Sequence, residues 1–500
     1  MHEKNIKIMV RKQLKEKFPH WNKFNRKEKK ALARQVLAEV EKEYDFGQKV
    51  TVPLPELTGV PEINEQGIMT LAEMERFVTE RERRLIKLPS IRERYIQDAE
   101  LRAVSLLLDD DILNLLLAPP GYTPYLRTIH PAHLMRAELL KSLKCAGLTY
   151  RQYCPTQLDS LERKTYRAFV GLPLNRRRNI SHSQLSQFRT GLAFSQMVNF
   201  IVYILHLLIS SGRMDRRWIV GEADSSELPA ICNPVPLATL KIGDKKQVRI
   251  YADLDADCGT RRNKRDKSKY FVGYRMHTLA AIDSRTGQSY PIISLIAPGN
   301  HHDNLLLKQL VHLSKAIGLE LKVIITDEGY GDAEQNQEIQ QEYGVTVIHP
   351  PQSKVHLPES VDPQSRAVYR DKCCDIPMTY LGKTDTGAHE FTCGDETGEC
   401  LLSAVCSKCR EIPQDAGYFG VIPNQVSGVK ELNQLRKHAE RPFNLLKHRE
   451  GLEPLRVRSQ HGVMAVATIA CAANLLLEIV ATRKTKPKEV SPQLRLKEAA

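Results

Sequence analysis

Hydrophobic and polar positions follow a helical spacing over most of the first 213 residues. Basic helices are predicted over 1–50, and apolar residues recur at every third or fourth position over 71–117 and in shorter segments beyond. Residues 51–61 contain three prolines, which lack the N–H donor that a helix needs. The pattern therefore predicts a basic helical segment and linker over 1–60 and an all-α region over 61–240.

The pattern changes to strands near residue 247. Residues 247–253 are rich in β-branched and aromatic side chains, and two further strands, 270–282 and 289–297, are joined by a turn containing Asp and Gly. The next predicted elements are a helix at 304–317, a strand at 322–326, a helix at 333–342 and a strand at 345–348. This β-β-β-α-β-α-β order predicts an α/β core over 241–350.

Helical spacing returns after a cysteine-rich stretch. We expect an insertion over 351–427, further core helices over 428–482 that include an apolar helix at 463–481, and a basic tail over 483–500. The longest apolar runs are shorter than the roughly 20 residues of a membrane-spanning helix. The first ten residues show no secretory signal. A cytoplasmic protein without a membrane span is expected.

Lysine and arginine outnumber aspartate and glutamate by 73 to 59, which gives a net charge of +14, and half of this excess lies in the first 50 residues. The excess favours a polyanionic partner, although a solvated helix face gives the same composition. Ser181 can cap a helix behind the basic turn Arg176, Arg177 and Arg178, and such a helix can bind phosphate at its N-terminus. An ordinary bundle helix is the alternative.

Two aspartates stand at the carboxyl ends of predicted strands. Asp253 closes the first strand, and Asp327 follows the fourth. Because adjacent strand ends lie close together, the two carboxylates could share a divalent cation, for which oxygen ligands suit Mg²⁺. Asp255 and Asp257 would lie on the same face as Asp253, and Asp255 is the alternative first acid. Three consecutive aspartates at 109–111 are expected to cap a helix or stay solvated.

A third carboxylate lies on the helix predicted near residue 440. Arg436 and Glu440 are spaced i, i+4, and Glu440 and Lys447 are spaced i, i+7, so all three project from one helix face. A carboxylate between two cations stays ionised for a metal, while the cations can hold a phosphate. A solvated ion-pair helix is the alternative, and Pro442 indicates that the helix bends or begins there.

The cysteine-rich insertion contains six of the eleven cysteines. Cys406 and Cys409 have the Cys-x2-Cys spacing of a zinc site, with Cys393 and either Cys373 or Cys374 as the other arm. In a reducing cytosol a metal is favoured over a disulfide. The open alternatives are a structural zinc ion and free thiols.

These features resemble the DDE transposases of bacterial insertion sequences. The predicted strand and helix order is that of their RNase H-like core, and Thr326-Asp-Glu-Gly-Tyr330 resembles their second-Asp motif. Segments 271–277 and 297–303 resemble their second and third strands. The resemblance implies an RNase H-like mixed sheet preceded by an all-α DNA-binding part.

One subgroup of this family carries a Tyr-x2-Arg-x3-Glu-x6-Lys signature. The chain matches its last three letters, while Asn433 stands where Tyr is expected. The resemblance implies that Asp253, Asp327 and Glu440 hold Mg²⁺ or Mn²⁺ for DNA cleavage and strand transfer. The residues expected at DNA are Arg436, Lys447, Tyr330, Arg176, Arg177 and Arg178.

The expected partners are double-stranded transposon ends and target DNA, bound by a homodimer at the bacterial nucleoid. Two alternatives stay open on the sequence alone. One is an RNase H-like nuclease that cuts without joining strands, and the other is a domesticated, non-catalytic DNA-binding protein.

Overall fold

The computed structural model describes the chain in separate stretches, and the predicted linker and basic tail lie outside them. The described residues are 3–43, 66–82, 91–123, 128–242, 246–260, 270–350, 357, 359–362, 367–370, 374–395, 409–413, 427–436, 440–449 and 451–481.

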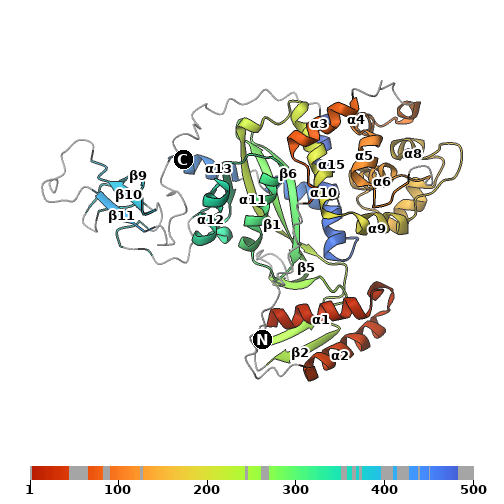
Figure 1. Cartoon of the computed structure of the whole chain (residues 1–500), viewed down its shortest axis with the longest axis horizontal. Coiled ribbons are helices and arrows are strands. Elements are labelled where there is room, and N and C mark those ends of the chain that lie inside the picture. Colours follow the sequence, from red (N-terminus) through yellow and green to blue (C-terminus); the bar gives the residue numbers. More distant parts are fainter. Residues whose placement is uncertain are drawn as a thin grey trace.

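A two-helix unit at the N-terminus packs on a hairpin from the middle of the chain (Figure 1). α1 (Glu3–Lys17) contacts β3 (Lys246–Ile250), and α2 (Arg26–Glu43) contacts β2 (Ala238–Ile242), with η1 (Trp21–Lys23) between the helices. The buried core of this unit is formed by Val10, Leu14, Trp21, Ala33, Val36, Leu37, Val40, Leu237, Ala238, Ile250 and Leu254. The N-terminal helices are thus held by residues about two hundred positions away.

A helical bundle follows, as the sequence predicts. Its elements are α3 (Leu71–Glu82), η2 (Ile91–Tyr95), α4 (Ala99–Leu107), α5 (Asp110–Leu117), α6 (Pro131–Lys144), α7 (Tyr150–Tyr153), η4 (Cys154–Leu158), α8 (Lys164–Val170), α9 (His182–Gly191), α10 (Phe194–Ser210) and η5 (Arg216–Trp218). Ser181 caps α9 as expected, because its hydroxyl accepts from the Gln184 N–H at 3.2 Å.

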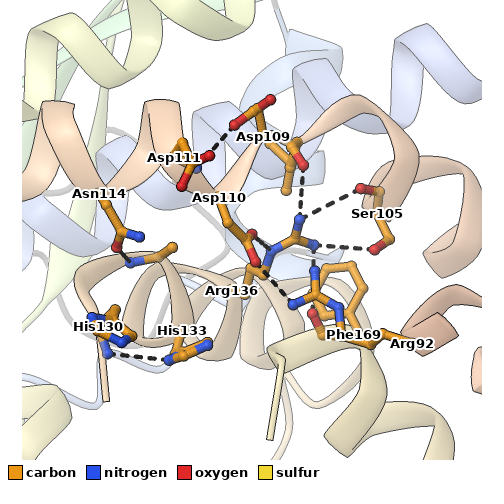
Figure 2. Close-up of polar contacts among 12 residues, drawn as sticks. Arg92, Ser105, Asp109, Asp110, Asp111, Asn114, His130, His133, Arg136 and Phe169 are labelled. Atoms are coloured by element: carbon orange, nitrogen blue, oxygen red, sulfur yellow. Dashed lines mark hydrogen bonds and ion pairs between the residues drawn. The ribbon is translucent and has the colours of Figure 1, made fainter. Parts of the chain in front are cut away.

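A buried arginine joins four segments of this bundle (Figure 2). Arg136 is 1% exposed, and its Nε donates to Asp110 at 2.5 Å. Its other nitrogens donate to the Ser105 hydroxyl at 3.2 Å and to the Leu108 carbonyl at 2.8 Å. The other oxygen of Asp110 accepts from Arg92 at 2.9 Å. Every charge in the cluster therefore has a partner.

A six-stranded mixed sheet forms the centre of the molecule (Figure 1). Its strands are β1 (Ile219–Pro229), β4 (Asp257–Thr260), β5 (Tyr270–Asp283), β6 (Gln288–Pro298), β7 (Val323–Thr326) and β8 (Thr346–Ile348). The order is β4-β5-β1-β7-β8, and β6 also pairs with β5. β1 is antiparallel to β5 and parallel to β7, which is parallel to β8. Strands β5 to β8 confirm the predictions, but β1 lies in a range predicted to be helical.

Helices cover both faces of this sheet. The connections after β6 contain η6 (Asp303–Leu306), α11 (Leu307–Ala316), η7 (Glu328–Tyr330) and α12 (Ala333–Tyr343). α15 (Gln460–Val480) packs on β6 and α10. By length and composition α15 could cross a membrane, and α9 with α10 passes the same test as a bent pair, but 83% of the most apolar window of α15 is buried inside the protein. The surroundings of α15 are those of a core helix.

The rest of the described chain forms a small sheet and three short helices. β9 (Thr379–Lys383), β10 (His389–Thr392) and β11 (Cys409–Ile412) form an antiparallel sheet in the predicted insertion. α13 (Ser427–Leu435), α14 (Glu440–Asn444) and η10 (Leu445–Arg449) follow. The helical segment predicted around residue 440 is described as α13 on one side and as α14 with η10 on the other side of residues 437–439, which lie outside the described residues.

Candidate active site

Asp224 and Asp327 lie at the same edge of the sheet, on adjacent parallel strands. The register of β1 and β7 pairs Glu222 with Ile325 and Ala223 with Thr326. One residue farther along each strand stand Asp224 and Asp327, which this register places opposite each other. Adjacent strands lie about 4.8 Å apart, so the two aspartates are near neighbours.

Both aspartates belong to the sheet face that α13 covers. Side chains alternate along a strand, so Asp224 shares a face with Val220, and Asp327 shares a face with Val323. The apolar members of this face pack with α13 in one cluster, formed by Val220, Val323, Ile325, Ile348, Val429 and Leu432. The carboxylates therefore border an apolar layer that keeps water from one side.

Local backbone contacts orient the two carboxylates. Asp327 is 8% exposed, and its Oδ1 accepts from the Gly329 N–H at 2.8 Å, which caps η7. Asp224 is half-buried, and its Oδ1 accepts from the Ser225 N–H at 2.7 Å. Asp327 thus begins the turn of η7, and it also occupies a strand end beside a second carboxylate.

Glu222 is a third carboxyl group on this face, two residues before Asp224. It is 3% exposed, and neither carboxylate oxygen has a hydrogen-bond partner in the described structure. The pKa of Glu222 is raised to about 9, chiefly by burial and also by the nearby charge of Asp224, while Arg436 acts in the opposite direction. A carboxyl group left this way in a strand interior costs stability.

His349 follows β8 and lies near Asp327. Its Nδ1 is 2.8 Å from the Pro350 carbonyl oxygen, and since a carbonyl can only accept, Nδ1 carries the proton and Nε2 is the accepting nitrogen. Burial lowers the pKa of His349, while the Pro350 contact and the charge of Asp327 act in the opposite direction. The strand ends of β1, β7 and β8 thus bring Asp224, Asp327 and His349 to one edge.

The predicted third acid, Glu440, is the first residue of α14. Its side chain lies outside the described part of the structure. Arg436 directly follows α13, is half-buried and acts electrostatically on Glu222. Lys447 lies in η10, with its Nζ 3.5 Å from Glu453. Residues 437–439, between α13 and α14, lie outside the described residues, so the single helix face for Arg436, Glu440 and Lys447 stays a prediction.

The predicted position of Asp253 beside Asp327 is wrong. The strand before it, β3, pairs with β2, and the strand beside β7 is β1. Asp253 lies near Tyr274, which opposes Leu228 of β1. Leu228 is four positions beyond Asp224, about 13 Å along the strand. The apolar pattern near residue 250 serves the core of the N-terminal unit, not the central sheet.

The acidic segment 253–257 is engaged by other parts of the chain. Asp253 accepts from the Ser459 N–H at 3.4 Å and Asp255 from the Gln460 N–H at 3.1 Å, where α15 begins and anionic groups are favoured. Lys15 donates to Asp255 at 2.5 Å. Lys7 forms an ion pair with Asp257, which is also 3.6 Å from Arg11.

The six residues expected at DNA lie in different environments. Tyr330 is fully buried, so a DNA contact through its side chain is incompatible with this structure. Arg176 and Arg177 are exposed and Arg178 is half-buried. A further basic surface lies on α2, where four exposed cations share one helical stripe and make no ion pair with described residues. We call it the α2 basic stripe; its members are Arg26, Lys27, Lys30 and Arg34.

The cysteines assigned to a zinc site are only partly described, since Cys373 and Cys406 lie outside the described residues. Cys374, Cys393 and Cys409 all lie toward the same end of the small sheet, where Thr392 pairs with both Thr379 and Cys409. Cys374 and Cys393 are half-buried and Cys409 is exposed. Among described residues, no group of three His, Cys, Asp or Glu side chains is placed to hold a metal ion.

The residues that sequence reasoning missed are Asp224, Glu222 and His349. A signal for Asp224 is present, because it follows the run from Ile219 as Asp327 follows the run from Val323. His349 likewise follows a predicted strand. Glu222 has no such signal, since a glutamate in a buried strand contradicts the usual pattern. The carboxylate pair itself has the hard oxygen donors that Mg²⁺ and Mn²⁺ prefer.

Comparison with known proteins gives a family match over part of the chain. Residues 244–476 match the family described as "Transposase DDE domain", a range that includes Asp253, Asp327 and Glu440 and begins after Asp224. A solved piggyBac transposase, in a synaptic complex with hairpin DNA, is similar at 10% identity, with a TM-score of 0.27 over 79% of this chain and 82% of that chain. No curated protein matches. The family match supports a DDE transposase.

Proposed function

We propose that this protein is a DNA transposase that cuts at the ends of its element and joins them to target DNA. The observation that carries the proposal is the register of β1 and β7, which sets Asp224 opposite Asp327 within a chain whose residues 244–476 match a transposase DDE domain. We assign the role of first acid to Asp224 instead of Asp253. Glu440, at the start of α14, is the third acid.

The strand arrangement supports an RNase H-like core. Three antiparallel strands, β6, β5 and β1, are followed by β7 and β8, which are parallel to β1. A helix, α11, connects β6 to β7, and α12 connects β7 to β8. Such a sheet places the carboxyl ends of its parallel strands at one edge, where ligands of α/β sheets bind.

The carboxylates fit one or two divalent cations, Mg²⁺ or Mn²⁺. Bound there, such ions lower the pKa of an attacking water or 3′-hydroxyl and stabilise the leaving oxygen at phosphorus. Asp224 and Asp327 hold the cation from adjacent strands, and the Gly329 N–H keeps Asp327 oriented. Arg436 and Lys447 bind the phosphates of the transferred end.

DNA binding outside the catalytic edge is assigned to two basic surfaces. Arg176, Arg177 and Arg178 precede α9, and the α2 basic stripe lies on the N-terminal unit. Both are expected to contact phosphates without reading bases, because isolated exposed cations bind backbone charge. A homodimer on DNA would pair the two element ends.

A structural zinc ion in the insertion is a separate part of the proposal. Among the described residues, the buried core of the small sheet consists of Val361, Val368, Met378, Phe391 and Ile412. A structural metal commonly stabilises a small module of this kind. Cys393 and Cys409 lie at one end of this sheet, and Cys406 and Cys373, which lie outside the described residues, would complete the ligand set.

The test is metal-dependent cleavage and joining on a plasmid that carries the gene with its flanking DNA. Wild type is compared with Asp224→Asn, Asp327→Asn, Glu440→Gln and Asp253→Asn in Mg²⁺ and in Mn²⁺. Loss of both reactions in the first three, with Asp253→Asn active, supports the assignment. Loss in Asp253→Asn with activity in Asp224→Asn would return the role to Asp253.

Two further results would change the function itself. Cleavage without joining by the wild-type chain would mean a nuclease. Salt-sensitive DNA binding without cleavage in either metal would mean a non-catalytic DNA-binding protein.

A further inference from the structure

The turn that carries Asp327 closes tightly just after β7. The Asp327 Oδ1 accepts from the Gly329 N–H at 2.8 Å, and its carbonyl oxygen accepts from the Tyr330 N–H at 3.2 Å. The Tyr330 carbonyl then accepts from the Asp332 N–H at 2.8 Å across Gly331, whose φ of −75° and ψ of 61° are those of an inverse γ-turn. The direction of the Asp327 carboxylate therefore depends on how firmly this turn is held.

A buried amide on α12 binds the same carbonyl. Asn336 is 1% exposed, and its Nδ2 donates to the Tyr330 carbonyl oxygen at 3.2 Å. Asn336 and Ile339 are the buried residues of α12, so an apolar side chain would suit the first position as it does the second. The Asn336 Oδ1 has no hydrogen-bond partner among the described residues, which costs stability. Packing does not explain this amide, whereas its hydrogen bond to Tyr330 fixes the turn of Asp327.

A second amide reaches the turn from η6. The Nδ2 of Asn304, which is half-buried, donates to Asp332 Oδ2 at 3.2 Å. The other oxygen, Asp332 Oδ1, accepts from the Gln335 N–H at 3.1 Å and so caps α12. Asp332 is also the residue whose N–H closes the turn on Tyr330. Two asparagine amides, one from α12 and one from η6, thus hold η7 in place.

We propose that Asn336 and Asn304 are positioning residues for Asp327, which fix the η7 turn and keep the carboxylate directed at the cation that it shares with Asp224. This inference rests on the cation site of the proposed function. An amide suits the task because it donates a hydrogen bond without adding charge beside the carboxylates. Hydrogen bonds behind a metal ligand hold the ligand in place, and loss of one commonly lowers metal affinity about 10- to 100-fold.

The test measures metal binding directly in the full chain. Mn²⁺ is titrated into wild type, Asn336→Val, Asn304→Ala and Asp327→Asn, and free Mn²⁺ is followed by electron paramagnetic resonance. The site compared is the one that Asp327→Asn removes. Asn336→Val is expected to weaken Mn²⁺ binding there about tenfold, and Asn304→Ala by a smaller factor because its bond is less buried. Wild-type affinity in Asn336→Val overturns the proposal.

Amide hydrogen exchange of the metal-free protein reports on the turn itself. A peptide that spans residues 327–332 is expected to exchange about tenfold faster in Asn336→Val, because the Tyr330 carbonyl loses a donor and the turn opens more often. Exchange of this peptide at the wild-type rate would mean that Asn336 does not hold the turn, and the proposal would fail.

A matched control separates positioning from folding. Gln337→Ala removes an amide from an exposed position of the same helix and is expected to keep the wild-type Mn²⁺ affinity and exchange rate. A merely structural role of Asn336 would lower the fraction of folded protein, so that fewer chains bind Mn²⁺ while those that bind it keep the wild-type affinity. That result overturns the proposal.

The outcomes distinguish this inference from the proposed function. Wild-type cleavage that Asp327→Asn abolishes, together with wild-type Mn²⁺ affinity of Asn336→Val, overturns the positioning role alone. Mn²⁺ binding that weakens in Asn336→Val, without cleavage by the wild-type chain, supports the positioning role and overturns the proposed function. Absence of both Mn²⁺ binding and cleavage in wild type overturns the two together.

Discussion

Two clusters of buried charge in this molecule are built in opposite ways. In the helical bundle, Arg136 and Asp110 are surrounded by partners, and Arg92 completes the pair (Figure 2). At the sheet edge, Asp224 and Asp327 oppose each other on adjacent strands, and Glu222 behind them has no hydrogen-bond partner in the described structure. The first cluster is complete within the fold, while the second brings carboxyl groups of like charge together.

The pKa directions express the same difference. Burial alone would raise the pKa of Asp110, but Arg136 and Arg92 outweigh it and lower the pKa. For Glu222 burial dominates, and the single cation Arg436 does not restore the ordinary value. Arginines thus neutralise the first cluster, whereas carboxyl groups of like charge meet at the sheet edge, which is the arrangement expected of the cation site proposed there.

The largest effect is expected from Asp→Asn substitution at the sheet edge. Asp224→Asn or Asp327→Asn should lower Mg²⁺-dependent cleavage about 10³-fold, equivalent to about 4 kcal/mol of transition-state stabilisation. The melting temperature should stay level or rise, because like charges at the edge are reduced. Single-turnover cleavage and thermal unfolding are the measurements. Unchanged cleavage in these two variants would contradict the contrast drawn between the sheet edge and the bundle cluster.

The same substitution in the bundle should have the reverse effect. Asp110→Asn leaves Arg136 buried without its anion, which is expected to cost about 3 kcal/mol of unfolding free energy. Urea unfolding gives this value, and cleavage per folded molecule should remain at the wild-type level. Equal stability of Asp110→Asn and wild type would mean that the bundle cluster is not complete within the fold.

Acid should weaken the bundle through His133. Burial lowers its pKa to about 4, so the folded state holds it neutral while the unfolded chain binds a proton near pH 6.5. Its contribution to stability is therefore present above pH 6.5 and lost as the pH falls toward 4, by about 2 kcal/mol after allowance for partial solvent exposure. Urea unfolding between pH 7 and 4.5 should show this loss in wild type and a smaller one in His133→Gln.

The smallest effect is expected in the acidic segment beside the N-terminal unit. Asp257→Asn removes the partner of Lys7 and should loosen this unit by about 1 kcal/mol without lowering cleavage per folded molecule. The chain has only two tryptophans, so Trp218→Phe leaves Trp21 as a reporter of the unit's unfolding. Loss of cleavage in folded Asp257→Asn would extend the reactive cluster into segment 253–257.

The sequence predicts most of the central sheet but not the strand that matters most. β5, β6 and β7 are found because their runs are apolar and end in turn residues. β1 is not predicted because Gly221, Glu222 and the polar residues after Ala223 interrupt its apolar pattern. Two of these interruptions, Glu222 and Asp224, are carboxyl groups at or beside the proposed site, and such polar residues hide a strand from a pattern based on burial.

The error at Asp253 arises because the sequence pattern makes β3, rather than β1, resemble the strand that lies beside β7. The run before it is more β-like than β1, and only tertiary packing shows that this run closes the core of the N-terminal unit. Asp327 and the start of α14 at Glu440 are local features and could be read directly. The partnership of Asp224 with Asp327 is a matter of register, which no single segment contains.

The docking of α1 and α2 on the β2–β3 hairpin fixes when the N-terminal unit can fold during synthesis. Val40 leaves the ribosome about 200 residues before Leu237, which closes the same core. At roughly 5–20 residues per second, the two amphipathic helices wait about 10–40 s for their partner. During that interval β1 with Glu222 and Asp224 is made, so the first helices of the chain reach their final place only after this strand of the central sheet has emerged.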